Sequence, residues 1–264
     1  MLNSSLLTAL REKKPLIHNL TNEVVTNFTA NGLYAIGAAP VMSKSRDEAA
    51  EMASISDGVL INIGTLTSED VDAMLQAGKK ANELGLPVVL DPVGVGATTY
   101  RQEICQQFIN NISFTAIRGN AGEIATLIHQ DWETRGVDSS DKGDVAGIAQ
   151  QAAKELNTLI LLTGETDVVS DGTQTVLCRN GTSMLTAITG SGCLLGSVLT
   201  AFLTLGGQPV DNAVTAVTTY GVASEQAVPK ANGPGTFHAH FLDALAAVTE
   251  ETVAQYGRVE QKDV

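Results

Sequence analysis

The chain alternates short apolar runs with amphipathic stretches of helical spacing, and this alternation constrains its fold more than any other feature. Brief apolar runs are typical of strands buried on both faces of a parallel sheet. The stretches between them supply the crossover helices that parallel strands need. We therefore predict an α/β fold whose mostly parallel sheet is covered by helices on both faces. The apolar runs lie at 16–17, 39–42, 58–63, 87–90, 114–117 and 158–162.

Two capping-box patterns predict helix starts between these runs. Ser45 is followed three residues later by Glu48, and Thr67 is followed at the same spacing by Asp70. A further short amphipathic helix is expected at the N-terminus, before the first run.

The pattern changes after residue 162. We expect two strands here, at 167–170 and 173–178. Asp171 and Gly172 between them are typical of a hairpin turn, so the pair predicts an antiparallel edge on the sheet. Three helices follow, near 192–206, 209–228 and 239–256. Residues 257–264 are expected to fray. The polar stretch 129–145 is interpreted as a solvated loop, with a lid as the alternative.

Composition limits the partners of this chain. Its 264 residues are 44% hydrophobic, and no linker interrupts them, which favours a single domain over 1–264. The net charge of −13 disfavours nucleic acid and anionic membranes as partners, because both bind basic surfaces. Any phosphate site must therefore be built from local donors.

The cysteine and histidine patterns exclude other classes. Three cysteines without a CxxC pair and four histidines without HExxH argue against a disulfide framework and a zinc site, and they fit a reducing cytosol. The basic residues of the N-terminus follow its apolar stretch, the reverse of a signal peptide. The uncharged segment 188–205 offers only about 13 apolar helical residues, too few to span a bilayer, so we predict a buried core helix.

Candidate binding residues follow the apolar runs. In an open α/β sheet, ligands bind at the carboxyl ends of the strands. Four runs end in polar or glycine residues, which should lie along one edge of the sheet. These ends are at 62–64, 91–94, 118–120 and 163–165.

The sequence TGSGC at 189–193 leads directly into an apolar helix. Gly190 and Gly192, with Ser191 between them, allow close approach of the backbone to a ligand, and the helix N-terminus favours an anion. We predict an anion hole here. Close helix packing is the alternative explanation of the glycines, and neither the P-loop pattern nor GxGxxG fits.

Three charged residues near the strand ends are candidates for phosphate and metal chemistry. Asp91 precedes a proline and could hold Mg²⁺ through water, although a turn would also explain it. Glu123 lies at a predicted helix start, where an acid suits the helix dipole. Arg118 has the fork geometry that binds phosphate.

Several segments resemble the hydroxyethylthiazole kinase family, a ribokinase-like group. They are 19–42 (NLTNEVVTNFTANGLYAIGAAPVM), 60–66 (LINIGTL), 88–98 (VVLDPVGVGAT), 116–124 (AIRGNAGEI), 162–168 (LTGETDV) and 189–197 (TGSGCLLGS). The resemblance implies a three-layer α-β-α fold and a cytoplasmic enzyme of thiamine salvage, which phosphorylates 4-methyl-5-(2-hydroxyethyl)thiazole with ATP and Mg²⁺. It also implies a homotrimer with thiazole sites between subunits.

The resemblance also implies roles for individual residues. Met42 and Gly190 would contact the thiazole, and Asn22 would belong to the substrate loop. Arg118 and Thr163 would contact ATP, and Asp91 and Glu123 would lie near Mg²⁺ and the phosphates.

Cys193 stands where sugar kinases of this fold usually have an aspartate base. One hypothesis is a thiolate base, because a helix N-terminus lowers the pKa of a thiol. The other assigns most of the stabilisation to the glycine-rich amides and Mg²⁺, because phosphoryl transfer needs little early proton removal. We favour the second hypothesis. A third is that Cys193 is a small buried residue at the helix start with no catalytic role.

Two other functions are weighed against the thiazole kinase. One is a related kinase for another small alcohol, such as a hydroxymethylpyrimidine. The other is a non-catalytic metabolite-binding protein, which would be stabilised by its ligand without producing ADP.

Overall fold

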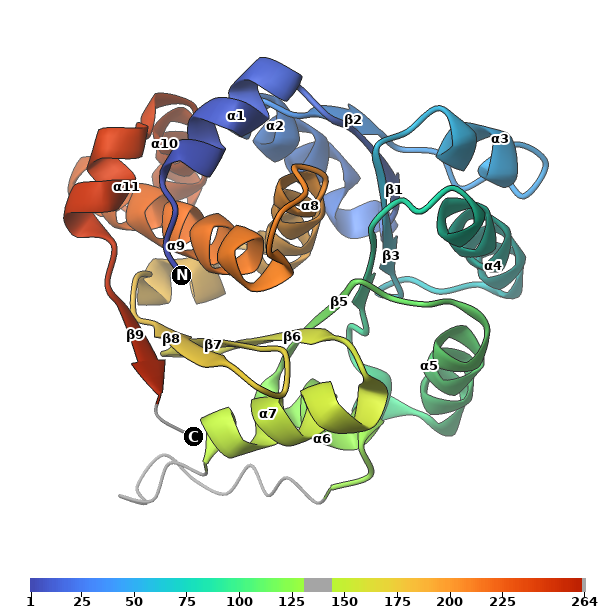
Figure 1. Ribbon diagram of the computed structural model, residues 1–264. Coiled ribbons are helices and arrows are strands. Elements are labelled where there is room, and N and C mark those ends of the chain that lie inside the picture. The colour runs from blue at the N-terminus through green and yellow to red at the C-terminus, as the bar shows by residue number, and fades with distance from the viewer. Residues whose placement is uncertain (131–143, 263–264) are drawn as a thin grey trace.

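A computed structural model describes residues 1–130 and 144–262 of the chain (Figure 1). Within them, nine strands form one sheet in the order β2-β1-β3-β4-β5-β6-β7-β8-β9. Pairing is parallel from β2 to β6 and antiparallel from β6 to β9, which confirms the predicted mostly parallel sheet with an antiparallel edge. The strands are β1 (Leu16–Leu20), β2 (Ala39–Val41), β3 (Gly58–Asn62), β4 (Val88–Asp91), β5 (Ala116–Asn120), β6 (Leu159–Thr163), β7 (Asp167–Ser170), β8 (Thr175–Cys178) and β9 (Val259–Lys262).

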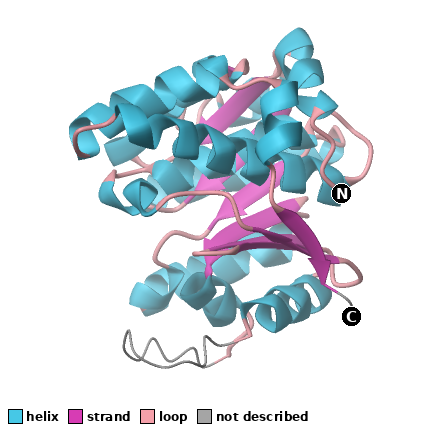
Figure 2. Cartoon of the chain, turned by 90° about the vertical axis from the view of Figure 1, so that its left-hand side faces the viewer, coloured by secondary structure: helices cyan, strands magenta, loops and turns pink. Residues whose placement is uncertain are grey.

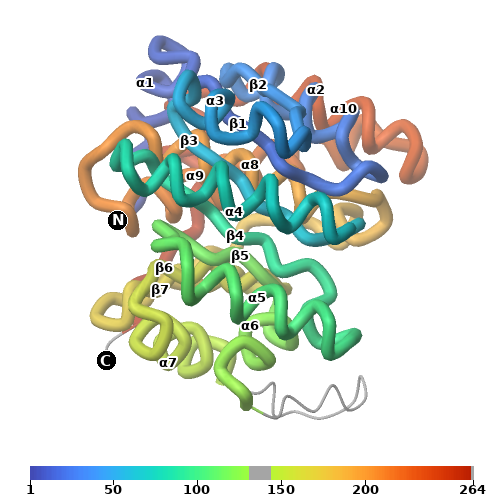
Figure 3. Tube along the Cα trace, turned by 90° about the vertical axis from the view of Figure 1, so that its right-hand side faces the viewer, coloured from blue at the N-terminus to red at the C-terminus, as the bar shows by residue number. Residues whose placement is uncertain are grey.

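Helices cover both faces of the sheet, giving the expected three layers (Figure 2). Successive residues of β3 show why: Leu60 packs into one apolar cluster, whereas Val59 and Ile61 pack into the other. One layer holds α1 (Ser5–Lys13), α2 (Thr26–Ile36), α8 (Ser191–Leu203), α9 (Pro209–Ala227), α10 (Pro234–Ala247) and α11 (Glu250–Tyr256). The other, seen in Figure 3, holds α3 (Ala49–Ser54), α4 (Ser68–Glu83), α5 (Thr99–Asn111), α6 (Ala121–Leu127) and α7 (Val145–Leu156).

One of the two predicted capping boxes forms. Thr67 caps α4 by accepting from the Asp70 N–H, and the Asp70 carboxylate accepts from the Thr67 N–H in return. The box at Ser45 and Glu48 is wrong, because α3 begins only at Ala49 and Glu48 itself occupies the cap position. The Glu48 carboxylate instead accepts from the Ser43 hydroxyl. The helix therefore starts four residues after Ser45, too late for Ser45 to cap it.

The predicted third C-terminal helix over 239–256 is also wrong, because two helices occupy this stretch. Val248 is extended at ψ 134° and ends α10. Thr249 then starts α11, its hydroxyl accepting from the Thr252 N–H at 3.2 Å. A side-chain cap that competes with the helix ladder explains the break.

The tail does not fray as expected, since residues 259–262 form β9 along the edge of β8. This pairing satisfies backbone groups of β8 that would otherwise form an open edge. The predicted N-terminal helix is α1, and the apolar segment 188–205 contains the 13-residue α8. No helix in the described ranges has the length and apolar character that a membrane span requires. The expected loop or lid at 129–145 falls mostly outside the described residues.

Candidate active site

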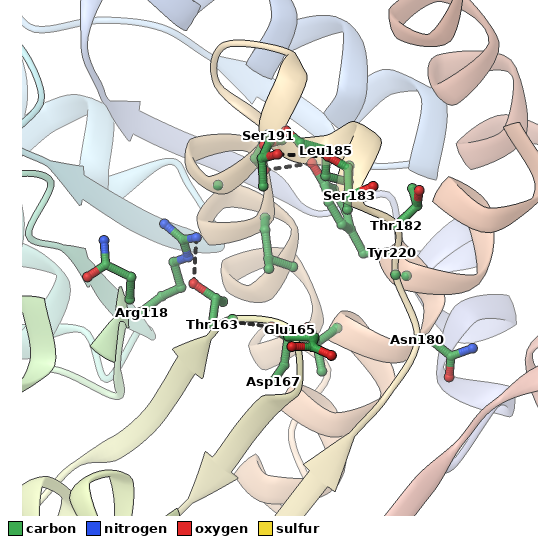
Figure 4. A pocket seen from close by; sticks show the side chains of 18 residues that line it. Arg118, Thr163, Glu165, Asp167, Asn180, Thr182, Ser183, Leu185, Ser191 and Tyr220 are labelled. Carbon is green, nitrogen blue, oxygen red and sulfur yellow. Dashed lines mark hydrogen bonds between the residues drawn. The ribbon is translucent and has the colours of Figure 1, made fainter. Parts of the chain in front are cut away.

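The polar strand ends meet at one edge of the sheet, as predicted. Asn62 and Asp91 are paired in register at the ends of β3 and β4, and Asn62 Nδ2 donates to Asp91 Oδ2 at 2.6 Å. Arg118 on β5 links Asp91 to the end of β6: its guanidinium lies 3.4 Å from Asp91 Oδ1 and donates to Thr163 Oγ1 at 2.8 Å (Figure 4). Four neighbouring strands, β3 to β6, thus hold one polar network.

Arg118 is the cation of this network. Its side chain is only 13% exposed, and Asp91 is fully buried. Burial lowers the pKa of Arg118, but the nearby Asp91 and Glu123 carboxylates outweigh it and raise that pKa above its ordinary value. Within the described part of the chain, its buried Nε has no hydrogen-bond partner. A charged guanidinium with an unused donor suits a phosphate oxygen.

The glycine turn before α8 lies against this arginine. Gly190 has a φ of +91°, and a Cβ there would lie 2.5 Å from Val25. A Cβ on Gly192 would lie 2.6 Å from the guanidinium nitrogens of Arg118. The backbone of residue 190 therefore requires glycine, and a side chain at residue 192 would displace the Arg118 guanidinium. The helical ladder starts with Leu194 N–H donating to the Gly190 C=O at 2.9 Å, so the N–H groups of residues 191–193 precede it and can bind an anion.

Tyr220 on α9 holds the same turn in place, a role that sequence reasoning missed. Its hydroxyl donates to the Ser191 C=O at 2.6 Å, and Ser191 Oγ donates to the Leu185 C=O at 2.7 Å. One feature of the sequence could have indicated this role: Tyr220 is a large side chain among the mostly small side chains of α9.

A cavity of about 540 Å³ opens beside the turn and Arg118. Drug-sized and cofactor-sized ligands occupy cavities of about this size. Figure 4 shows Arg118 and Thr163 on one side and Asn180 and Thr182 on the other, with Tyr220 behind. Three parts of the chain line the cavity. They are β5, the end of β6 and the turn into β7 (Arg118, Asn120, Thr163, Gly164, Glu165, Asp167), the segment after β8 (Asn180, Gly181, Thr182, Ser183, Leu185, Thr186) and helices α8 and α9 (Ser191, Gly192, Leu195, Val217, Tyr220, Gly221).

Asp167 is a lining carboxylate whose charge the fold disfavours. Burial raises the pKa of Asp167 to about 7, although Oδ1 accepts from the Gly164 N–H at 3.0 Å. An unfolded aspartate ionises near pH 3.9, so between these values the folded state holds one proton more than the unfolded state. The contribution of Asp167 to the free energy of unfolding therefore falls as the pH rises from about 4 to about 7.

We expect Asp167→Asn to be more stable than the parent by about 2 kcal/mol near pH 8 and nearly equal to it near pH 4. The amide oxygen can still accept from Gly164, while the cost of ionisation disappears. Urea unfolding at both pH values measures this. Asp144→Asn is the control, because hydrogen bonding to Gly147 N–H lowers the pKa of Asp144 and the pH dependence should have the opposite sign. A variant that is less stable than the parent near pH 8 would contradict the expectation.

The predicted substrate residues lie on the other side of the turn. Asn22, which follows β1, donates to Asn62 Oδ1 at 3.1 Å and to Cys193 Sγ at 3.4 Å. A Cβ on Gly190 would meet Val25 and Phe28, so this glycine faces the start of α2. Met42 follows β2 at the same edge of the sheet and is partly buried. Neither Asn22, Met42 nor Gly190 is among the described lining of the cavity.

Cys193 does not have the lowered pKa that one hypothesis required. Burial raises the pKa of its thiol to about 11, with Asp91 adding to the shift and donors such as Asn22 opposing it. Because the side chain is only 9% exposed, desolvation outweighs the helix N-terminus. The thiol is therefore neutral near pH 7.

The two proposed metal carboxylates already accept several hydrogen bonds. Glu123 Oε1 accepts from the Gly94 N–H at 2.9 Å, and Oε2 accepts from the Asn120 N–H at 2.8 Å, completing the capping box of α6. Among the described residues, no group of three or more His, Cys, Asp or Glu could hold a metal ion. The donor set fits a hydrated Mg²⁺, which keeps several waters and binds through one or two carboxylates and substrate phosphates. It does not fit a metal held by protein ligands alone.

The layers, the strand-end network and the glycine turn define a ribokinase-like α/β protein. In agreement, the fold is similar to a ribokinase-like superfamily protein from Enterococcus faecalis V583, with a TM-score of 0.66, 12% identity and coverage of 94% and 96% of the two chains. The sequence model described as the Hydroxyethylthiazole kinase family matches residues 7–251. The chain belongs to the hydroxyethylthiazole kinase family, as its motifs predicted.

Solved structures agree with this assignment. The hydroxyethylthiazole kinase protein from Pyrococcus horikoshii OT3 is 37% identical, with a TM-score of 0.91 and coverage of 98% of each chain. An ADP/ATP-dependent NAD(P)H-hydrate dehydratase from Bacillus subtilis, co-crystallised with ATP and Mg²⁺, is 17% identical, with a TM-score of 0.63 over 91% of this chain and 95% of that one. The latter similarity concerns the fold alone.

Proposed function

We propose that this protein transfers the γ-phosphoryl group of ATP to the hydroxyl of 4-methyl-5-(2-hydroxyethyl)thiazole, a salvage step of thiamine biosynthesis. The observation that carries the proposal is the glycine turn of α8, which faces Arg118 beside a cavity of about 540 Å³. Membership of the hydroxyethylthiazole kinase family supports the choice of alcohol.

The site suits phosphoryl transfer, which depends on positioning and on stabilising charge. ATP would lie in the cavity, with its phosphates against both Arg118 and the amides of residues 191–193, since Arg118 and Gly192 line it side by side. Those amides need no reorganisation, because Tyr220 and the helix hold the turn. The substrate hydroxyl attacks the γ-phosphorus, the bond to the β–γ bridging oxygen breaks, and ADP leaves with the bonding electrons. The hydroxyl proton is lost late in the transfer, to a phosphoryl oxygen or to water.

Asp91 and Glu123 are the residues that would hold the Mg²⁺ of the nucleotide, through its water ligands. The ion would supply positive charge to the phosphates. Burial raises the pKa of Asp91 to about 6, and the Arg118 charge opposes that rise. Above this pH Asp91 is thus mostly ionised and would attract the hydrated ion by its charge.

The thiazole would bind on the other side of the turn, near Asn22, Met42 and Gly190. We propose that a neighbouring subunit completes this side in a homotrimer, as the family resemblance implies. Two exposed side chains of the segment that follows β1 support a subunit contact: Val24, two residues after Asn22, is 70% exposed, and Tyr34, in the last turn of α2, is 66% exposed.

A neutral Cys193 thiol predicts a particular pH profile. We expect kcat to fall below about pH 6, as Asp91 takes up a proton and its pairing with Arg118 weakens, and to stay level between about pH 7 and 9. We also expect Cys193→Ser to lower kcat less than about tenfold, because the thiol orients the hydroxyl rather than removing its proton.

Steady-state rates of the parent, Cys193→Ser and Cys193→Asp across this pH range test the profile. A loss of more than about 100-fold in the serine variant, with a new ionisation in the profile of the aspartate variant, would assign Cys193 the role of base.

The proposed function is tested by incubating the protein with ATP, Mg²⁺ and hydroxyethylthiazole and following the products by phosphorus NMR. We expect one new phosphomonoester signal in step with ADP. If ADP forms only with a hydroxymethylpyrimidine, the kinase has another alcohol substrate. If the thiazole raises the melting temperature and no ADP forms with any alcohol, the protein is a binding protein.

A further inference from the structure

The wall of the cavity opposite Arg118 is a loop that α9 and the C-terminal segment hold in place. Residues 180–183, which follow β8, form this wall (Figure 4). Asn180 is only 5% exposed. A Cβ on Gly221 of α9 would lie 2.6 Å from the Asn180 C=O, so the loop packs directly on that helix. The position of the wall is therefore sensitive to small shifts of Asn180.

Glu225, one turn further along α9, binds the loop through both of its oxygens. Its Oε1 accepts from the Gly181 N–H at 2.7 Å, and Oε2 accepts from Asn180 Nδ2 at 3.2 Å. Glu225 does not line the cavity, and only 25% of its side chain is exposed. It contacts the residues that form the wall, not the space that a ligand would fill.

Arg258 completes the arrangement from the segment before β9. Its guanidinium pairs with Glu225 at 2.5 Å and donates to the Arg179 C=O at 2.8 Å. Its backbone N–H donates to Asn180 Oδ1 at 2.7 Å. Arg258 lies after residue 251, where the family match ends. The side chains of Asn180 and Glu225 thus hydrogen-bond to each other and to the C-terminal segment, and Glu225 also binds the Gly181 N–H.

We propose that Glu225 and Arg258 are positioning residues for nucleotide binding, which act by fixing residues 180–183 against the cavity. This inference rests on the proposed function, since it takes ATP as the occupant of the cavity. Neither residue lies at the glycine turn or near Cys193. Their loss should therefore weaken ATP binding without changing the chemical step.

The test is Glu225→Gln, which keeps the size of the side chain but removes the charge that holds Gly181 N–H and Arg258. We expect KM for ATP to rise about tenfold, equivalent to about 1.4 kcal/mol, while kcat and KM for the thiazole stay within about twofold. Arg258→Met should have the same effect. The double variant should be no worse than either single one, because both act through the same loop.

Glu260→Gln is the matched control. It removes a carboxylate charge from β9, where Glu260 forms an exposed ion pair with Arg179. KM for ATP should not change in this variant. Calorimetric titration with a non-hydrolysable ATP analogue gives the same comparison without turnover. Equal analogue affinity in the parent, Glu225→Gln and Arg258→Met, whatever their melting temperatures, would overturn the inference. If the parent binds the analogue but makes no thiazole phosphate, the proposed function fails while this test still holds.

Discussion

Gly192→Ala is expected to lower kcat by about 100- to 1,000-fold, the loss typical of removing one preorganised donor from a site that stabilises developing charge. The added methyl group would lie 2.6 Å from the Arg118 guanidinium. Arg118 can move away only by giving up its hydrogen bonds to Asp91 and Thr163. The turn and the arginine must separate, and the phosphate would lose contact with one of them.

Steady-state kinetics with ATP and the thiazole measure this loss. Gly235→Ala on α10 is the control, since nothing lies within 4 Å of the Cβ it would add and its kcat should match the parent. A Gly192→Ala enzyme with unchanged kcat and KM would show that this turn does not hold the transferring phosphoryl group. Circular dichroism and a melting curve establish that the variant is folded.

Arg118→Ala is expected to lower kcat/KM for ATP by about 1,000-fold, at the lower end of the range for arginines that neutralise a transferring phosphoryl group. It should also destabilise the fold, because Asp91 is fully buried and would lose its countercharge. Without the arginine the pKa of Asp91 rises further above 6. The loss of stability should therefore be large near pH 8 and small near pH 5, where Asp91 is protonated with or without the arginine.

Arg118→Lys separates the two effects, since it keeps the charge beside Asp91 but loses the planar fork. We expect it to recover most of the stability and little of the kcat/KM. Kinetics at varied ATP and urea unfolding at both pH values provide the measurements. An unaltered KM for ATP in both variants would remove Arg118 from the nucleotide site.

Much of the site could be predicted because each of its parts follows from a short sequence pattern. Parallel strands bring their carboxyl ends to one edge, so Asn62, Asp91, Arg118 and Thr163 were expected to be neighbours, and the structure joins them. A glycine turn before a helix likewise predicts exposed amides from a short pattern. The wrong predictions came from local patterns that are compatible with two structures. Examples are the capping box predicted at Ser45 and the continuous helix predicted through residue 248.

The sequence alone determined the class of fold, the family and the edge of the sheet that carries the polar residues. Only the tertiary structure decided the protonation of Cys193, because its pKa depends on burial by distant segments rather than on its place at a helix start. Only packing brought Tyr220, Glu225 and Arg258 against the turn and the wall of the cavity. Glu225 and Arg258 lie at no parallel strand end and at no glycine turn, the patterns that predicted the rest of the site, so no spacing in the sequence indicated their hydrogen bonds.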